Sequence, residues 1–422
     1  MEKITNTITS TNLQTTCLLI ICSILTTVVV WGCGETKSSL AERNILVSDT
    51  LKMSQRIADS EIYRRGLSLD YNPDNPSVKW NYQTGLFLKS LLDLGEASGR
   101  QKYYDFAKRV TDSFIQENGT IKTYKIEDYN IDHINPGKVL LKLYKTTGDT
   151  TYKKTAGLLR KQLENHPRTK AGGFWHKKRY PWQMWLDGIY MGAPFYTEYS
   201  QLFNQPKGFE DVIKQVLLID VHTRDPKTGL RYHAWDESSQ QEWANPETGC
   251  STHFWGRAMG WYAMALVDIL DFLPEDYPKR DKLLFILNDL MISVAKYQDE
   301  NSGLWFQVLD QGERAGNYLE ASASSMFVYA LTKAVNKQYI NSSYKVAAEK
   351  GYNGILKKLV RIDKNGLVNL TQICSVAGLG GNPYRDGSYE YYLSEPVVEN
   401  DLKGIGPFIL ACLEMEKLNK IK

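Results

Sequence analysis

Apolar side chains recur every three or four residues along most of the chain after Leu40, which is the spacing of one buried face of an α-helix. Polar segments that contain Gly or Pro separate these stretches, as expected at helix ends. Alternating strand patterns are rare, and residues 304–308 form the best strand candidate. The pattern predicts an all-α fold with twelve helices, at residues 41–66, 81–97, 101–117, 136–147, 150–165, 188–203, 208–223, 255–272, 277–298, 320–336, 341–359 and 402–418.

A weak internal repeat suggests that these helices pair. A Leu-rich helix end leads through Gly99 to Tyr103, and a second one leads through Gly148 to Tyr152, so the two glycines lie 49 residues apart. Gly just past a helix end favours a left-handed cap, and this spacing matches one helical hairpin with its loops. Six hairpins can form an open superhelix or close into an (α/α)6 barrel, and the repeat is compatible with both. Because no Pro- or Ser-rich linker interrupts residues 80–420, we expect a single domain.

The N-terminus has the features of an export signal. Residues 17–30 are mostly apolar and uncharged, and this stretch is too short for a membrane span of about 20 residues. The following Val30-Trp31-Gly32-Cys33 resembles a bacterial lipoprotein signal. We therefore expect a signal peptide at residues 1–32, a lipidated Cys33 and a catalytic domain at residues 33–422, in a periplasm-facing or cell-surface protein. The alternative to this lipoprotein signal is a plain signal peptide or a short membrane anchor. In the lipoprotein interpretation, the lipid on Cys33 is the protein's one contact with the membrane.

Composition narrows the range of partners and cofactors. The chain carries 51 basic and 48 acidic residues, a balance that gives no reason to propose a nucleic-acid partner. Beyond Cys33 the three cysteines are widely spaced, unlike a disulfide framework or a zinc site. The chain also lacks HExxH, P-loop and GxSxG motifs, so we expect neither a metal nor a cofactor.

Two aspartates in aromatic surroundings are candidates for acid–base chemistry. Asp132 stands just before a predicted helix, and Asp187 follows a nearly uncharged stretch rich in Trp. Each could simply cap its helix. In the functional alternative, an apolar aromatic wall raises the pKa of the Asp187 carboxyl, so that it can serve as a general acid near neutral pH.

A cation and an aromatic ring lie close together on another predicted helix. Arg257 and Trp261 are four residues apart and so share one helix face. A guanidinium next to an aromatic plate suits a sugar ring that bears a carboxylate. The alternative is that Trp261 packs in the core and Arg257 forms an ion pair.

Several longer motifs resemble those of a known enzyme family. They are Trp185-Leu186-Asp187-Gly188, Trp255-Gly256-Arg257-Ala258-Met259-Gly260-Trp261-Tyr262, Tyr318-Leu319-Glu320-Ala321-Ser322-Ala323 and Ser394-Glu395-Pro396-Val397-Val398. In this order, and within residues 75–418, they resemble glycoside hydrolase family 105, the unsaturated rhamnogalacturonyl hydrolases. The related family 88, the unsaturated glucuronyl hydrolases, is less similar in these motifs. The resemblance implies an (α/α)6 barrel.

The resemblance also implies a reaction and a set of site residues. Enzymes of this family hydrate the C4=C5 enol ether of a 4,5-unsaturated uronic acid at the non-reducing end of oligosaccharides left by lyases. Asp187 matches the catalytic acid/base, and Asp132 matches the second carboxylate. The residues that match the substrate pocket are Tyr82, His176, Lys177, His233, Arg257 and Trp261.

Three other functions are compatible with the sequence. The same chemistry could act on unsaturated glucuronyl ends, as in ulvan-type or other glucuronic-acid glycans. An inverting glycosidase could use Asp132 and Asp187 as its carboxylate pair. A lipid-anchored sugar-binding protein without activity is the third alternative.

Overall fold

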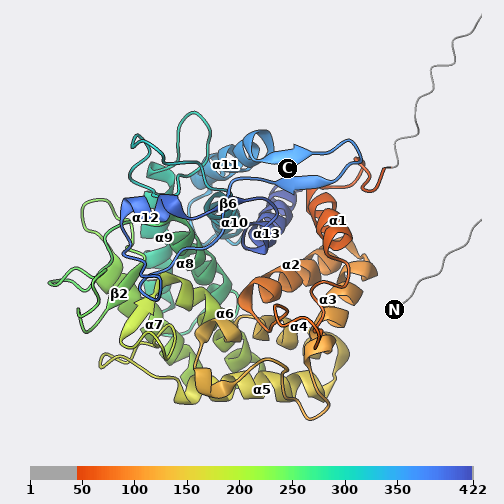
Figure 1. Ribbon diagram of the computed structural model, residues 1–422, viewed down its shortest axis with the longest axis horizontal. Helices are drawn as coiled ribbons and strands as arrows, with labels where there is room; N and C mark the ends of the chain where they lie inside the picture. Colours follow the sequence, from red (N-terminus) through yellow and green to blue (C-terminus); the bar gives the residue numbers. More distant parts are fainter. Residues whose placement is uncertain (1–44, 421–422) are drawn as a thin grey trace, which may run out of the picture. The chain divides into compact units, whose positions relative to one another are not determined.

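The computed structural model describes residues 45–420, which fall within one compact unit. Six helices form an inner ring: α2 (Tyr82–Ser98), α4 (Gly137–Thr147), α6 (Leu186–Leu202), α8 (Gly256–Leu270), α10 (Ala321–Asn336) and α13 (Leu402–Leu418). Each of them contacts the next, and α13 returns to contact α2, so the ring is closed (Figure 1).

A second set of helices surrounds this ring. These are α1 (Met53–Arg65), α3 (Gln101–Phe114), α5 (Thr150–Asn165), α7 (Lys207–Thr223), α9 (Arg280–Lys296) and α11 (Lys345–Lys358). Each packs on one inner helix: α1 on α13, α3 on α2, α5 on α4, α7 on α6, α9 on α8 and α11 on α10. The predicted (α/α)6 barrel of six helical hairpins is therefore confirmed, and the closed form is the one adopted.

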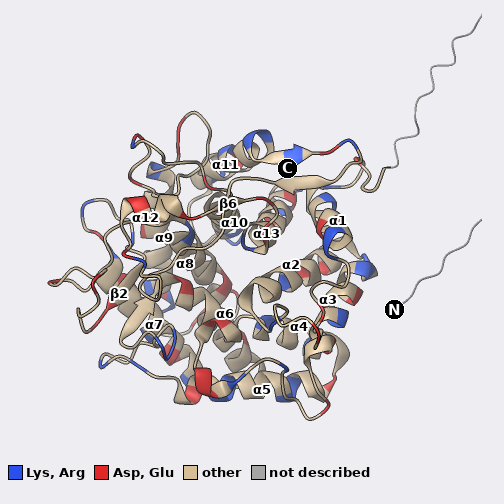
Figure 2. Ribbon diagram, viewed as in Figure 1, with Lys and Arg blue, Asp and Glu red and all other residues tan. Residues whose placement is uncertain are grey.

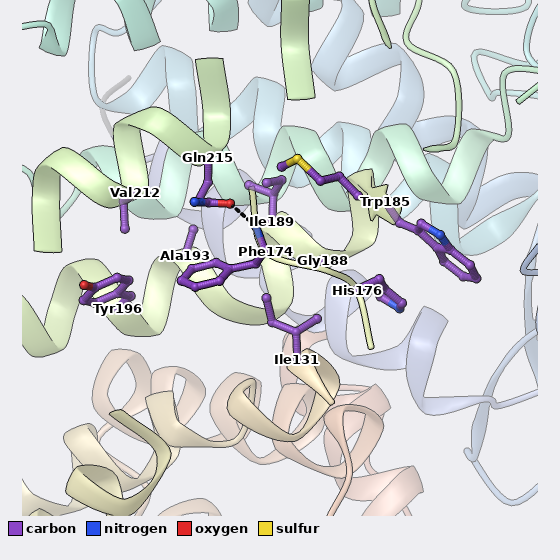
Figure 3. A pocket seen from close by; sticks show the side chains of 11 residues that line it. Ile131, Phe174, His176, Trp185, Gly188, Ile189, Ala193, Tyr196, Val212 and Gln215 are labelled. Carbon is purple, nitrogen blue, oxygen red and sulfur yellow. Dashed lines mark hydrogen bonds between the residues drawn. The ribbon is translucent and has the colours of Figure 1, made fainter. Parts of the chain in front are cut away.

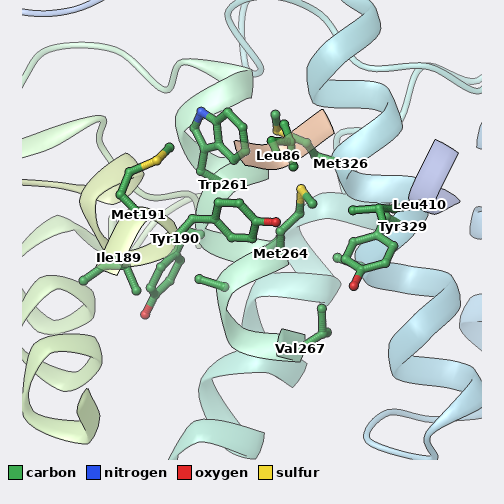
Figure 4. Packing of buried hydrophobic residues seen from close by; sticks show 14 of the residues in the cluster. Leu86, Ile189, Tyr190, Met191, Trp261, Met264, Val267, Met326, Tyr329 and Leu410 are labelled. Atoms are coloured by element: carbon green, nitrogen blue, oxygen red, sulfur yellow. The ribbon is translucent and has the colours of Figure 1, made fainter. Parts of the chain in front are cut away.

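Burial explains which helices are inside. Helix α8 is buried along nearly its whole length, as expected for a helix that is apolar on all sides. Its Trp261 packs against Tyr190 of α6 and lies near Met326 of α10 (Figure 4). Helix α5 is instead exposed on one side, which carries mainly Lys and Arg side chains (Figure 2).

The glycines of the sequence repeat have the expected conformation. Gly99 and Gly148 both end their helices in the left-handed region, with φ of 66° and 73°. Tyr103 and Tyr152 are both buried on the helices that follow. The pairing of successive helices predicted from this repeat is thus confirmed.

Short strands connect loops at one end of the barrel. Strand β1 (Gln183–Trp185) pairs antiparallel with β2 (Ala234–Asp236), which joins the loops before α6 and α8. The other antiparallel pairs are β3 (Val360–Ile362) with β4 (Val368–Leu370), and β5 (Ile373–Cys374) with β6 (Val397–Val398).

Three details of the sequence prediction were wrong. Within the described residues, the helix predicted at 41–66 begins at Met53, and residues 45–52 form turns and bends instead. Residues 304–308 form no strand, because they make single bridges to two different loops, Phe306 with Leu319 and Val308 with Trp255. The short helix α12 (Tyr389–Ser394) was not predicted. It has only six residues, too few for a helical periodicity to be visible.

The predicted signal peptide, Cys33 and the domain boundary at residue 33 lie outside the described residues. Of the helices within residues 45–420, none is both long and apolar enough to cross a membrane. Cys250, Cys374 and Cys412 are buried free thiols.

Candidate active site

Polar side chains gather where the inner helices begin. Tyr82 opens α2, Asp187 lies in the first turn of α6, Arg257 lies in the first turn of α8 and Glu320 caps α10. Asp132 lies in a 3-10 turn, Ile131–Ile134, just before α4. Since successive inner helices are separated by one antiparallel outer helix, they run parallel and begin at the same end of the barrel. The positive ends of their dipoles favour a negatively charged ligand there.

Asp187 faces His233 across the short β1–β2 sheet. The amide of Leu186 donates to the carbonyl of His233 at 3.0 Å, and this bond fixes the two loops together. Asp187 Oδ2 then lies 3.3 Å from His233 Nε2. Within residues 45–420, neither of these buried atoms has a hydrogen-bond partner. Both are therefore free to bond to a substrate or a water molecule.

His233 is held from its other side. Its Nδ1 lies 2.8 Å from the hydroxyl of Tyr392, and its ring packs against Trp255 and Trp185. The imidazole is fully buried. These contacts fix the ring plane, so Nε2 stays directed at Asp187.

Asp132 has a different environment from Asp187. Its Oδ2 lies 2.6 Å from Lys177 Nζ, and its Oδ1 lies 3.5 Å from His176 Nε2. Burial alone would raise the pKa of Asp132, but the Lys177 ammonium outweighs it and holds the pKa below its usual range. Asp132 is therefore a carboxylate at neutral pH.

His176 is fixed by stacking and by its backbone. Its ring lies parallel to Trp185 at 4.4 Å, and its amide donates to the carbonyl of Gln183 at 2.8 Å. Burial lowers the pKa of His176 to about 4, although the Asp132 carboxylate opposes this effect. The imidazole is thus neutral at pH 7 and acts on Asp132 as a neutral neighbour.

Tyr82 lies close to both carboxylates. Burial raises the pKa of Tyr82, and the charges of Asp132 and Asp187 raise it further. Its ring meets the edge of Trp261 at 6.2 Å. Tyr82 therefore remains a neutral phenol that can donate a hydrogen bond next to the carboxylate pair.

Arg257 and Trp261 lie deeper than the sequence suggested. Both side chains are about 1% exposed. Arg257 Nε donates to Ser322 Oγ at 2.7 Å, and its other nitrogens bond to Glu320 and to the carbonyls of Cys374 and Ser375. Trp261 stacks on Tyr190 at 5.0 Å. A direct contact of either side chain with a sugar stays a prediction, and their packing roles are already evident.

Hollows of different size lie next to residues that contact the aspartates. A small, mostly apolar cavity of about 20 Å³ lies behind His176 and Gly188, which is enough for about one water molecule (Figure 3). Two open grooves lie at the surface nearby, one lined by Lys177 and Asn130 and the other by Gln183 and Tyr180. In the described residues, no three His, Cys, Asp or Glu side chains are grouped to hold a metal ion.

The structure brings five of the predicted site residues together in two groups: Asp132 with His176 and Lys177, and Asp187 with His233. The Trp185 ring lies against both imidazoles and so joins the two groups. Sequence reasoning missed Tyr392, which holds His233, and the stacking role of Trp185. The Tyr-rich run just before the motif at residues 394–398 was the available signal for Tyr392.

The inner helices of this closed double ring begin at two carboxylates, the buried Asp132 and the half-buried Asp187. This fold and this site define a helical-barrel glycoside hydrolase. The sequence model of Glycosyl Hydrolase Family 88 matches residues 53–419, so the chain belongs to that family. The predicted resemblance to glycoside hydrolase family 105, and its relation to family 88, are both confirmed.

Individual relatives agree with this assignment. A solved glycoside hydrolase from family 105 of C. acetobutylicum ATCC 824 is 49% identical, with a TM-score of 0.83 over 87% of this chain and 100% of that one. Protein Atu3128 of Agrobacterium fabrum is 42% identical over 230 residues, which cover 53% of this chain and 97% of that protein. The unsaturated rhamnogalacturonyl hydrolase YesR of Bacillus subtilis is 28% identical over 293 residues, covering 66% of this chain and 78% of that protein.

Proposed function

We propose that this glycoside hydrolase removes the 4,5-unsaturated uronic acid from the non-reducing end of oligosaccharides made by polysaccharide lyases. The preferred substrates are unsaturated rhamnogalacturonyl disaccharides from pectin. The similarity to YesR, whose name states this activity, supports the substrate class. The positive ends of the inner helices at the site suit the carboxylate that such a sugar carries.

The difference between the two aspartates carries the proposal. Asp132 is paired with Lys177 and ionised, so it is unsuited to donate a proton. Within residues 45–420, Asp187 has no Lys or Arg within ion-pair distance, and its free Oδ2 faces the neighbouring His233 Nε2. Two carboxyl groups in contrasting environments are typical of an acid–base site with divided roles.

The reaction follows from these roles. The Asp187 carboxyl donates its proton to C4, and positive charge develops at C5 and the ring oxygen. The Asp132 carboxylate stabilises that charge. Water then attacks C5 and gives a proton to the Asp187 carboxylate, which restores the acid. The resulting hemiketal opens, and the anomeric hemiacetal releases the leaving sugar.

Absorbance of the C4=C5 bond tests the proposal. Purified enzyme should remove this absorbance from an unsaturated galacturonyl-rhamnose disaccharide, and Asp187→Asn and Asp132→Asn should each slow the loss. Parallel assays with unsaturated glucuronyl disaccharides, with and without sulfate, report the leaving sugar. Faster turnover of a glucuronyl substrate would transfer the activity to ulvan-type or similar glycans. Stable absorbance with every substrate, together with measurable binding, would leave a sugar-binding protein.

We also propose that the enzyme is exported and anchored through lipid on Cys33. The apolar segment at residues 17–30 and the Val30-Trp31-Gly32-Cys33 string support this. Mass spectrometry of the mature protein from its native cell should find an acylated Cys33 at the N-terminus. An unmodified N-terminus at another position would exclude the lipid anchor.

A further inference from the structure

A buried lysine lies in the barrel where the proposed reaction does not use it. Lys138 is in the first turn of α4 and is only 3% exposed. Its Nζ lies 3.6 Å from the centroid of the Tyr190 ring. Within residues 45–420, this nitrogen has no hydrogen-bond partner. An ammonium in such a place is costly unless it interacts favourably, and the face of an aromatic ring provides such an interaction.

The carboxylates around Lys138 are already paired with other lysines. The groups whose charges act on it are Lys89 and Asp93 on α2, Glu198 on α6 and Asp268 on α8. Asp93 pairs with Lys89, Glu198 with Lys145 and Asp268 with Lys333, each at 2.6 Å. Asp268 also accepts from the hydroxyl of Tyr329 on α10. Among the described residues, Lys138 forms an ion pair with none of these carboxylates, and its ammonium lies over the Tyr190 ring instead.

This ring is the first layer of an aromatic stack that leads to the site. Tyr190 of α6 stacks on Trp261 of α8 at 5.0 Å, with 26° between the ring planes (Figure 4). Trp261 in turn meets Tyr82 of α2, with 80° between the planes. The charges of both aspartates act on Tyr82 and raise the pKa of its phenol. One residue from each of four inner helices thus joins the buried ammonium to the carboxylate pair.

We propose that Lys138 is a positioning residue. As a cation it holds the Tyr190 ring against Trp261, and through Trp261 it fixes Tyr82 beside the substrate. When Lys138 loses its proton, this attraction is lost and the stack loosens. The effect on substrate rests on the proposed function, whereas the effect on the stack does not.

The charge on Lys138 should change within the working pH range. Burial lowers the pKa of Lys138 to about 7, and Asp268 opposes this only partly. The ammonium is therefore present below about pH 7 and lost above it. From the usual strength of a cation–π contact, we expect KM to rise about 2- to 30-fold as the pH passes through this value. Because Lys138 does not touch the reacting atoms, kcat should change less.

The stack can be observed without any substrate. In protein labelled with fluorotryptophan, the Trp261 signal is assigned by its absence in Trp261→Phe and is followed by ¹⁹F NMR from pH 5.5 to 9. It should shift with a midpoint near 7 in the wild type and stay constant in Lys138→Met and Lys138→Arg. Lys161→Met, which removes an exposed lysine of α5, should behave as the wild type.

Measurements of KM across the same pH range are the second test of the proposal. Lys138→Arg should keep a low KM across the range, and Lys138→Met should have a raised KM at every pH. A Trp261 signal that titrates equally in Lys138→Met, or that does not titrate in the wild type, would overturn the positioning role. Absence of turnover with every unsaturated disaccharide would instead overturn the proposed function, and the NMR result would still decide the role of Lys138. If Lys138→Arg does not fold, the comparison of the Trp261 signal and of KM between Lys138→Met and the wild type still tests the positioning role.

Discussion

Replacing Lys177 with Met tests the electrostatic account of the carboxylate pair. Lys177 Nζ lies 2.6 Å from Asp132 Oδ2, and the two side chains are 15% and 11% exposed. Met keeps most of the aliphatic length but removes the charge. The Asp132 carboxylate then keeps its burial and loses the strongest of the interactions that lower its pKa.

The burial of this ion pair sets the expected loss in the free energy of unfolding. Removing one partner of a buried ion pair costs about 3–5 kcal/mol of the free energy of unfolding. Because both side chains keep some exposure, we expect the lower end, about 3 kcal/mol.

The sign of the pH effect follows from the pKa directions. In the wild type, the lowered pKa of Asp132 contributes stability above the pKa of the unfolded chain, and this is lost as the pH falls through the folded pKa. In Lys177→Met, burial dominates and the folded pKa rises. Asp132 then takes up a proton at higher pH, so the acid limb of kcat/KM should move upward.

Urea unfolding at pH 7.5 and kcat/KM from pH 4 to 8 measure both effects. Lys178→Met is the matched control, because Lys178 is the next residue along the chain and is exposed. Among the described residues, its Nζ forms one hydrogen bond, to the carbonyl of Glu127. If Lys177→Met matches Lys178→Met within about 0.5 kcal/mol, the usual range of surface substitutions, and keeps the same acid limb, the reasoning is refuted.

Three further substitutions test the other parts of the site. Asp187→Asn keeps the shape of the side chain but cannot transfer the proton, so kcat should fall by about 10²- to 10⁴-fold with an unchanged near-UV circular dichroism spectrum; wild-type turnover would remove Asp187 from catalysis. Arg257→Ala leaves Glu320 buried without its cation, and urea unfolding should show a loss of about 3–5 kcal/mol. Unchanged stability with a raised KM would favour a sugar contact for Arg257 instead. Gly188→Ala places a methyl group 3.1 Å from His176 Nδ1, so the ring must move and kcat/KM should fall; unchanged kinetics would show that the position of His176 is unimportant.

The fold was largely predictable because the helices follow one strong pattern. Apolar spacing located the twelve long helices, and Gly99 and Gly148 indicated their pairing. Closure of the ring was not predictable from spacing alone, because it depends on contacts between α2 and α13, at opposite ends of the described chain. The resemblance to a known family supplied that step.

The sequence supplied candidate site residues but not their contacts. Asp187 was a candidate because of its aromatic surroundings and Asp132 because it matches a family motif, whereas the pairing of Asp132 with Lys177 depends on two loops that are distant in sequence. Arg257 was expected to face a sugar because it stands in an aromatic string. Its contacts with Ser322 and Glu320 lie more than one helix further along the chain, where local pattern carries no information.

The central claim is that Asp187 directs hydration of the C4=C5 bond rather than attack at the anomeric carbon. An unsaturated uronyl substrate whose glycosidic oxygen is replaced by carbon tests it most directly, because its anomeric bond cannot be hydrolysed. With the purified enzyme, we expect the C4=C5 absorbance of this compound to disappear, and Asp187→Asn to leave it unchanged. Persistent absorbance in the wild type, with normal cleavage of the matching oxygen-linked disaccharide, would contradict hydration and favour an inverting glycosidase that uses Asp132 and Asp187.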